Sequence, residues 1–200
     1  MTDNFAHRAA DWDQPSKIDM TNIFVNELLK NIAFDKQWTA LEIGAGTGLV
    51  GLQILPKVQK MIFEDTSEAM LQVLQTKLTG NENIEICLGE IFACNTKIDF
   101  ACSCMAFHHI PDIDAALAHL SSICNPNATI AIGDIRSEDG SFHRFEPIPH
   151  KGFDTDKLSL KFEKAGFVVE KCYTYNVLKR ERIAGIMSAY EQFLLVARKL

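Results

Sequence analysis

Three glycines at alternate positions, Gly44, Gly46 and Gly48, constrain the fold of this 200-residue chain more than any other feature. They follow an apolar segment at 39–43 that is typical of a buried strand, and an apolar pattern typical of a helix follows them. Glycine adopts positive φ and carries no Cβ, so the backbone can turn tightly here and approach a ligand closely. Amides at the start of the next helix would face that ligand. The pattern therefore predicts a strand, a ligand-binding turn and a helix.

An acidic residue, Glu42, lies two residues before the first glycine. A turn built for the pyrophosphate of NAD has the spacing G-x-G-x-x-G, whereas the turn in this chain has G-x-G-x-G. A carboxylate beside the loop repels a pyrophosphate but attracts an amine or a sulfonium. The spacing and the acid together favour methyl transfer from a sulfonium donor, with an NAD-type oxidoreductase as the alternative.

Four segments resemble, in chain order, the motifs of the class I S-adenosylmethionine-dependent methyltransferases. The first is Glu42 to Gly48, and the second is the D-x-S-x-x-M-L pattern that begins at Asp65, about twenty residues later, the interval that one helix and one strand need. The third is Gly89-Glu90, and the fourth is 98–112, which resembles the strand that ends in H-H-x-x-D. One glycine motif alone is weak evidence, whereas four motifs in order at domain spacing are specific.

The resemblance implies a site for the cofactor S-adenosylmethionine at the carboxyl ends of the strands. Glu42 would lie against the methionine part of the donor, Asp65 would bind both ribose hydroxyls, and Glu90 would lie near the adenine amine, where most relatives have Asp. Ile91 would cover one face of the adenine ring. The residues implied to bind the cofactor are Glu42, Gly44, Ala45, Gly46, Gly48, Asp65, Thr66, Met70, Gly89, Glu90, Ile91, Cys104 and Met105.

Strand-like and helix-like segments alternate along the chain, which predicts an α/β fold with parallel strands and right-handed crossovers. Strands are expected over 39–43, 58–64, 84–88, 98–104, 128–134, 167–178 and 190–199. Helices are expected over 18–34, 48–55, 67–78, 113–123 and 154–164. Ser67 reads as a helix N-cap and Gly166 as a C-cap. The resemblance implies a Rossmann-like three-layer sandwich, whose mostly parallel seven-stranded sheet has an antiparallel last strand.

The length of 200 residues, with 47% apolar and 23% charged residues, fits a single domain over 1–200. Within it, residues 1–35 are expected to form an N-terminal lid or helical segment. The segment from Phe5 to Asp13 resembles the F-x-x-x-A-x-x-W-D start of many small methyltransferases. In that family the segment covers donor and acceptor, which would exclude water when the site closes.

Methyl transfer needs mainly the in-line positioning of the nucleophile, and a base is needed only when the acceptor carries a proton. Histidine is the natural base near neutral pH. His108 and His143 are the candidate catalytic residues, because they come after the fourth and fifth predicted strands. His109, His150 and Asp134 are further candidates for the same pocket. Several of these histidines could also bind a metal together, but no residue has the paired C-x-x-C spacing of a zinc site, and no metal ligand is assigned.

Charge and hydropathy limit the possible partners. The net charge of −6 argues against nucleic acid, and the short basic run 179–182 is expected to be a solvated strand end. No apolar run approaches the ~20 residues of a membrane span, so we expect no membrane partner. Six cysteines are expected to be buried and reduced, with Cys102 and Cys104 on one face of a strand, which fits the cytoplasm. Binding of a soft metalloid by these thiols, as in arsenite methyltransferases, is the alternative.

The acceptor is predicted mainly by exclusion. The segment 104–107 lacks the D/N/S-P-P-aromatic and Pro-Cys signatures of nucleobase methyltransferases, and Asp134 is not followed by the Asn expected of a catechol-type magnesium site. A small molecule is therefore expected as acceptor, with a protein side chain as the alternative, and the oligomeric state is not predicted. The rival function is a sensor or assembly partner that binds the donor without turnover. An acceptor pocket filled by Phe107, Phe142 or Phe145 would favour that rival.

Overall fold

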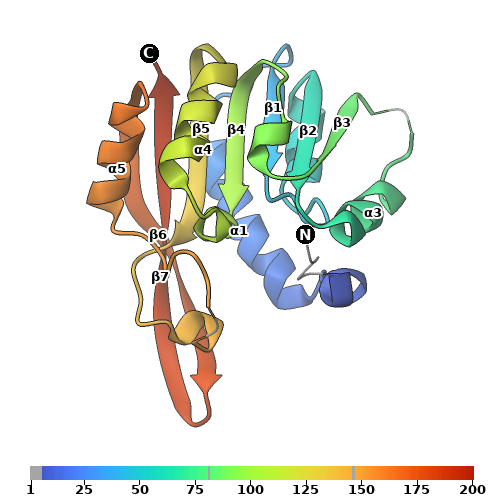
Figure 1. Ribbon diagram of the computed structural model, residues 1–200. Coiled ribbons are helices and arrows are strands. Elements are labelled where there is room, and N and C mark those ends of the chain that lie inside the picture. The colour runs from blue at the N-terminus through green and yellow to red at the C-terminus, as the bar shows by residue number, and fades with distance from the viewer. Residues whose placement is uncertain (1–5, 81, 146) are drawn as a thin grey trace.

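The computed structural model describes residues 6–80, 82–145 and 147–200; Phe5, the first residue of the predicted lid motif, lies outside them. Seven strands form one sheet in the order β3-β2-β1-β4-β5-β7-β6 (Figure 1). The strands are β1 (Thr39–Ile43), β2 (Lys60–Asp65), β3 (Ile84–Leu88), β4 (Ile98–Cys104), β5 (Cys124–Ile135), β6 (Phe167–Ile183) and β7 (Ile186–Lys199). The first five strands pair in parallel, and β7 is antiparallel to both β5 and β6. This is the predicted Rossmann-like sheet.

Helices cover both faces of the sheet and complete the predicted three layers (Figure 1). The α-helices are α1 (Pro15–Asn31), α2 (Gly51–Ile54), α3 (Glu68–Thr76), α4 (Ile113–Ile123) and α5 (Thr155–Lys164). Short 3-10 helices are η1 (Ala6–Asp11), η2 (Leu55–Lys57), η3 (Ile91–Ala93), η4 (Phe107–His109) and η5 (Ser141–His143). None of the helices in the described residues is long and apolar enough to cross a membrane.

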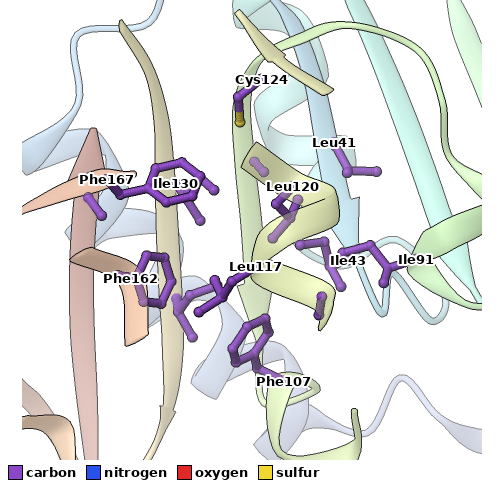
Figure 2. Close-up of a cluster of buried hydrophobic side chains, with 14 of the residues drawn as sticks. Leu41, Ile43, Ile91, Phe107, Leu117, Leu120, Cys124, Ile130, Phe162 and Phe167 are labelled. Carbon is purple, nitrogen blue, oxygen red and sulfur yellow. The ribbon is translucent and has the colours of Figure 1, made fainter. Parts of the chain in front are cut away.

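Two buried clusters lie on opposite faces of the sheet because successive strand side chains alternate. Leu41 faces the cluster under α4 and α5, whereas its neighbour Ala40 faces the cluster under α1, α2 and α3. Figure 2 shows the first cluster, in which Leu117 of α4 and Phe162 of α5 point onto the sheet. Ile130 on β5 belongs to the same cluster. The parallel strands are thus covered on both faces, and ligands have access at their carboxyl ends.

The predicted caps are present, and the helix ends differ from the prediction by a few residues. Ser67 accepts a hydrogen bond from the Met70 amide at 3.3 Å, and Gly166 adopts a φ of +86° after α5. Helix α1 begins three residues before its predicted start because Pro15 occupies the first turn, where proline is tolerated. Helix α2 is shorter than predicted because the glycine turn extends to its first residue, Gly51.

The hairpin of β6 and β7 is longer than predicted and extends beyond the rest of the sheet (Figure 1). Its turn includes Gly185, which has a φ of +77°. Arg182 lies within β6, and its guanidinium lies 4.9 Å from the ring centroid of Phe142, so the basic run is not simply a solvated strand end. The extension of β6 was not predicted because the charged sequence over 179–182 is not typical of a strand. In the structure the loop after β5 packs on one face of the hairpin, against Leu178 and Tyr190.

All six cysteines are free thiols, as predicted. Cys102 and Cys104 both belong to the α1 side of the sheet, where Cys102 is buried and Cys104 is partly buried. Cys172 is exposed, so the prediction that the cysteines are buried is wrong at this position.

Candidate functional site

The glycine turn after β1 lies directly against the segment that follows β4. Gly44, Gly46 and Gly48 have φ values of +66°, +54° and +81°. A Cβ on Gly44 would lie 2.3 Å from the Cβ of Ala106, which no real pair of carbon atoms tolerates. Gly44 is therefore required both by its conformation and by the close approach of Ala106. The turn and the end of β4 form one continuous backbone surface at the carboxyl edge of the sheet.

Asp65, the last residue of β2, ties this turn to the neighbouring strand. Its Oδ2 accepts a hydrogen bond from the Gly46 amide at 2.7 Å, and its Oδ1 accepts one from the Ser67 amide at 2.8 Å. An ionised carboxylate accepts several hydrogen bonds, and that of Asp65 lies at the carboxyl edge of the sheet beside the glycine turn. Thr66 beside it is exposed, whereas Met70 is buried beneath the turn.

Two further carboxyl groups support the turn from inside the protein. Glu42 accepts a hydrogen bond from the Gly51 amide at 2.8 Å, and Glu64 accepts one from the Gly44 amide at 3.1 Å. Burial raises the pKa of each carboxyl to about 8. Glu42 therefore holds the start of α2, and its contact with the donor's methionine part stays a prediction. Glu64 was not predicted; the only signal was the acidic pair that it forms with Asp65 at the end of β2.

The buried carboxyl groups predict how stability depends on pH. In the folded protein Glu64 keeps its proton up to about pH 8, whereas a model carboxyl releases its proton near 4.5. Unfolding between these values releases a proton, so we expect the free energy of unfolding to fall as the pH rises through this window. Glu64→Gln removes the ionisable group. The free energy of unfolding that the protein loses between pH 5 and pH 9 should therefore be smaller in this variant by about 1–3 kcal/mol.

Urea unfolding at several pH values tests this prediction. The exposed Glu163→Gln substitution on α5 is the control, and it should follow the wild-type pH dependence. If the free energy of unfolding depends on pH in the same way for Glu64→Gln and the wild-type protein, the assignment of a buried, protonated carboxyl at this position is wrong.

The residues predicted to lie around adenine follow β3. Gly89 has a φ of +135°, and its amide donates to the Asp65 carbonyl at 3.0 Å, which places this turn beside the donor loop. The Glu90 side chain is exposed at the start of η3. Ile91 is only 3% exposed and packs in the core cluster beside Ile43 (Figure 2), and its contact with the adenine ring stays a prediction.

The segment after β4 is strained where it passes the glycine turn. Met105 has a φ of +57°, which is uncommon for a residue with a side chain, and its amide donates to the Gly133 carbonyl at 2.8 Å. Its side chain packs beside the buried Ile135 and Tyr190. Cys104 packs on the α1 side. The backbone of this segment thus lies between the donor turn and the loop that follows β5.

The N-terminal segment is attached to the donor turn by polar contacts. Asp13 accepts a hydrogen bond from the Thr47 hydroxyl at 2.5 Å and pairs with the Lys77 ammonium at 2.6 Å. The Lys17 ammonium lies 3.3 Å from the ring centroid of Trp12, and a Cβ on Gly46 would lie 3.7 Å from the Trp12 indole nitrogen. Burial and the nearby Arg182 lower the pKa of Lys17 to about 8. Lys17 was not predicted, although it stands five residues after the Trp-Asp motif begins.

His108 and Asp134 form a buried polar pair beyond the end of β4. The His108 Nδ1 lies 2.7 Å from Asp134 Oδ1, and Asp134 Oδ2 accepts the His108 amide at 3.0 Å. The His108 Nε2 lies 3.0 Å from the Nε2 of His143, which η5 supplies. The structure thus brings the two predicted catalytic histidines together.

His109 completes a cluster of three imidazoles with His108 and His143. One ring nitrogen from each histidine lies within 4.8 Å of the others, so these residues could hold a metal ion. Burial, followed by the two neighbouring histidines, lowers the pKa of His109 to about 3. His150 lies apart from this set, since its Nε2 lies 3.0 Å from the Ile110 carbonyl.

The strand order, the glycine turn after β1 and the carboxyl groups behind it define a Rossmann-like fold of the type that binds S-adenosylmethionine. A family model described as a methyltransferase domain matches residues 41–130. This match and the similar proteins described below support a class I S-adenosylmethionine-dependent methyltransferase. These findings favour a methyltransferase over the NAD-type alternative.

Curated relatives match part of the chain. "Uncharacterized methyltransferase C1347.09" from Schizosaccharomyces pombe is 26% identical in an alignment of length 145 that covers 62% of this chain and 46% of the relative. "Uncharacterized methyltransferase OB1106" from Oceanobacillus iheyensis is 29% identical in an alignment of length 118 that covers 56% of this chain and 54% of the relative. The chain thus spans about half the length of these curated relatives.

Solved structures share the fold over nearly the whole chain. A chain of the complex between the Haloferax volcanii Trm112 methyltransferase activator and a methyltransferase has a TM-score of 0.82 at 16% identity, covering 100% of this chain and 98% of that one. An S-adenosylmethionine-dependent methyltransferase from Aquifex aeolicus has a TM-score of 0.72 at 20% identity, covering 98% of both chains. At this identity the likeness concerns the fold.

Proposed function

We propose that the protein transfers the methyl group of S-adenosylmethionine to a small-molecule acceptor. The observation that carries this proposal is the meeting of three segments at one edge of the sheet: the glycine turn held by Asp65, the segment after β4 that touches Gly44, and the histidine cluster beyond it. In-line transfer needs donor and acceptor to be held end to end, and these segments lie in that order.

On the donor side, the carboxylate of Asp65 binds the two ribose hydroxyls, and Glu90 lies at the adenine amine. Thr66 and Met70 border the ribose, and the amides of 44–48 approach the methionine part. Lys17 offers its ammonium to the donor's carboxylate, since it forms no salt bridge with an acid of the described residues. The N-terminal segment over 1–35 acts as a lid, and Asp13 holds its described part, which begins at residue 6, against the turn.

On the acceptor side, His108 accepts the proton that the acceptor loses, and Asp134 orients its ring and stabilises the cation that forms. His143 contacts the other nitrogen of the His108 ring, Nε2, on the side opposite to Asp134. A small molecule is the proposed acceptor, and a protein side chain is the alternative.

The rival function, donor binding without turnover, would be favoured by an aromatic side chain that fills the acceptor pocket. Phe107 instead packs in the core under α4 (Figure 2), Phe142 packs against Tyr190, and Phe145 is 60% exposed. These placements support the enzyme. The six free cysteines fit a reducing compartment, and we place the protein in the cytoplasm on that ground.

Calorimetric titration with S-adenosylmethionine, S-adenosylhomocysteine and NAD in parallel tests the donor assignment. We expect micromolar binding of the two sulfur nucleotides and no binding of NAD. If neither S-adenosylmethionine nor S-adenosylhomocysteine binds, the proposed function is wrong. A second assay adds a pool of small acceptors and measures the release of S-adenosylhomocysteine. Release by the wild-type protein, with a rate at least tenfold lower in His108→Ala, would show that the protein is an enzyme and not a sensor.

A further inference from the structure

The three histidines of the acceptor side are arranged as a set of metal ligands. His108 and His109 come from η4 and His143 comes from η5, so two separate loops contribute to one cluster. The ring centroids lie 4.2 Å apart for His108 and His109, 4.9 Å for His108 and His143, and 5.4 Å for His109 and His143. Three imidazoles at these distances can turn their nitrogens toward one point between them.

The distance between two of these nitrogens is close to that of a metal centre. Two imidazole nitrogens bound to one tetrahedral zinc ion, with bonds of about 2.05 Å, lie about 3.3 Å apart. The Nε2 atoms of His108 and His143 are separated by 3.0 Å. Since the ligand atoms of all three histidines lie within 4.8 Å of one another, modest rotation of the His109 ring brings the set to ligand geometry.

Asp134 supplies the support that a histidine ligand needs. Its fully buried carboxylate faces the Nδ1 of His108 at 2.7 Å, and it also accepts the amides of His108 and Ile135. A carboxylate only accepts hydrogen bonds, so Nδ1 carries the hydrogen and Nε2 presents its lone pair to the cluster. This arrangement of carboxylate and histidine is the one that orients histidine ligands in metal sites.

We propose that His108, His109 and His143 bind Zn²⁺, that Asp134 fixes the ring of His108, and that the open fourth position takes the thiol or hydroxyl of the acceptor. Imidazole ligands suit zinc, and three histidines with one open position are typical of a catalytic site. With zinc bound, His108 is a ligand, and the ion replaces the histidine base.

The consequence for the acceptor rests on the proposed function, whereas zinc binding itself does not. Zinc lowers the pKa of a bound thiol or hydroxyl, so its proton passes to solvent. A lone pair on the sulfur or oxygen then attacks the methyl carbon. The bond from this carbon to the donor's sulfur breaks, its electron pair stays on that sulfur, and the products are the methylated acceptor and S-adenosylhomocysteine.

Metal binding is measured on the full chain after treatment with a chelator, without donor or acceptor. The Cys172→Ser variant is the parent, because the exposed thiol of Cys172 could bind zinc by itself. We expect one Zn²⁺ per chain by calorimetry, and visible ligand-field bands of four-coordinate Co²⁺. His109→Ala and His143→Ala should each weaken zinc binding at least tenfold and abolish the Co²⁺ bands. Asp134→Asn should weaken it about 10- to 100-fold.

The matched control is His150→Ala, since His150 lies in the same region but outside the cluster. Its zinc affinity should equal that of the parent. Circular dichroism checks whether each variant is folded. If Asp134→Asn unfolds, His143→Ala, which removes a partly exposed side chain, carries the test. Absence of zinc binding by the parent, or binding that survives both histidine substitutions, would overturn the proposal. Zinc binding without S-adenosylmethionine binding would overturn the proposed function alone.

Discussion

Asp65→Ala is expected to weaken the binding of S-adenosylmethionine by about 1.5–3 kcal/mol, or roughly 10- to 150-fold in Kd. The proposed physical reason is the loss of two charge-assisted hydrogen bonds to the ribose hydroxyls. The carboxylate also accepts the amides of Gly46 and Ser67, so its removal loosens the turn. Calorimetric titration of wild-type and variant protein measures the total effect.

The two contributions are separated with a second ligand. Methylthioadenosine should lose affinity for Asp65→Ala through both contributions, whereas its analogue without the two ribose hydroxyls should lose only the smaller part that is due to the turn. Glu68→Ala, an exposed acid in the first turn of α3, controls for the change in net charge. Equal losses for both ligands would show that Asp65 acts on the turn alone, and the ribose assignment would then be wrong.

Gly44→Ala is expected to lower the free energy of unfolding by about 2–5 kcal/mol and to abolish donor binding in the protein that remains folded. The left-handed conformation of Gly44 costs an alanine about 1–2 kcal/mol. The remainder comes from the collision of the new methyl group with Ala106, 2.3 Å away, which forces the donor turn and the segment after β4 apart. Urea unfolding and calorimetric titration measure the two effects.

Gly185→Ala isolates the conformational part of this cost. Gly185 has a φ of +77° and no atom within 4 Å of its would-be Cβ, so only the strain of about 1–2 kcal/mol should be seen. The double variant Gly44→Ala/Ala106→Gly should recover the part due to the collision. If the Gly44 and Gly185 variants lose the same stability, the close contact with Ala106 does not matter.

The donor half of the molecule could be predicted from the sequence because its signals are local. The turn after β1 requires a glycine, which is Gly44, and the helix α3 begins with an N-cap, which is Ser67. The end of β2 carries the predicted acid, Asp65. The inward direction of Glu42 and Ile91 could not be predicted. Which way a side chain points at the end of a strand depends on the packing of α2 and α4, and neither helix leaves a signal at these two positions.

The acceptor half depends on contacts between residues far apart in the chain. The approach of His143 to His108 joins residues 35 positions apart, and the length of the hairpin decides where η5 lies. The histidines were recognised as candidates by type and position, but their convergence with His109 had no sequence signal. Lys17 and Glu64 were missed because a lone cation on a helix and an acid within a strand are ordinary surface residues in a sequence.

The match to the family model ends at residue 130, before Asp134, His143 and the long hairpin. The matched segment therefore contains the donor turn together with His108 and His109, whereas Asp134, His143 and the hairpin follow it. We expect changes in the loop after β5 and in the hairpin to alter the choice of acceptor without altering the donor turn. Exchanging residues 136–153 and 178–190 between related chains would be the direct way to redirect such an enzyme toward a new acceptor.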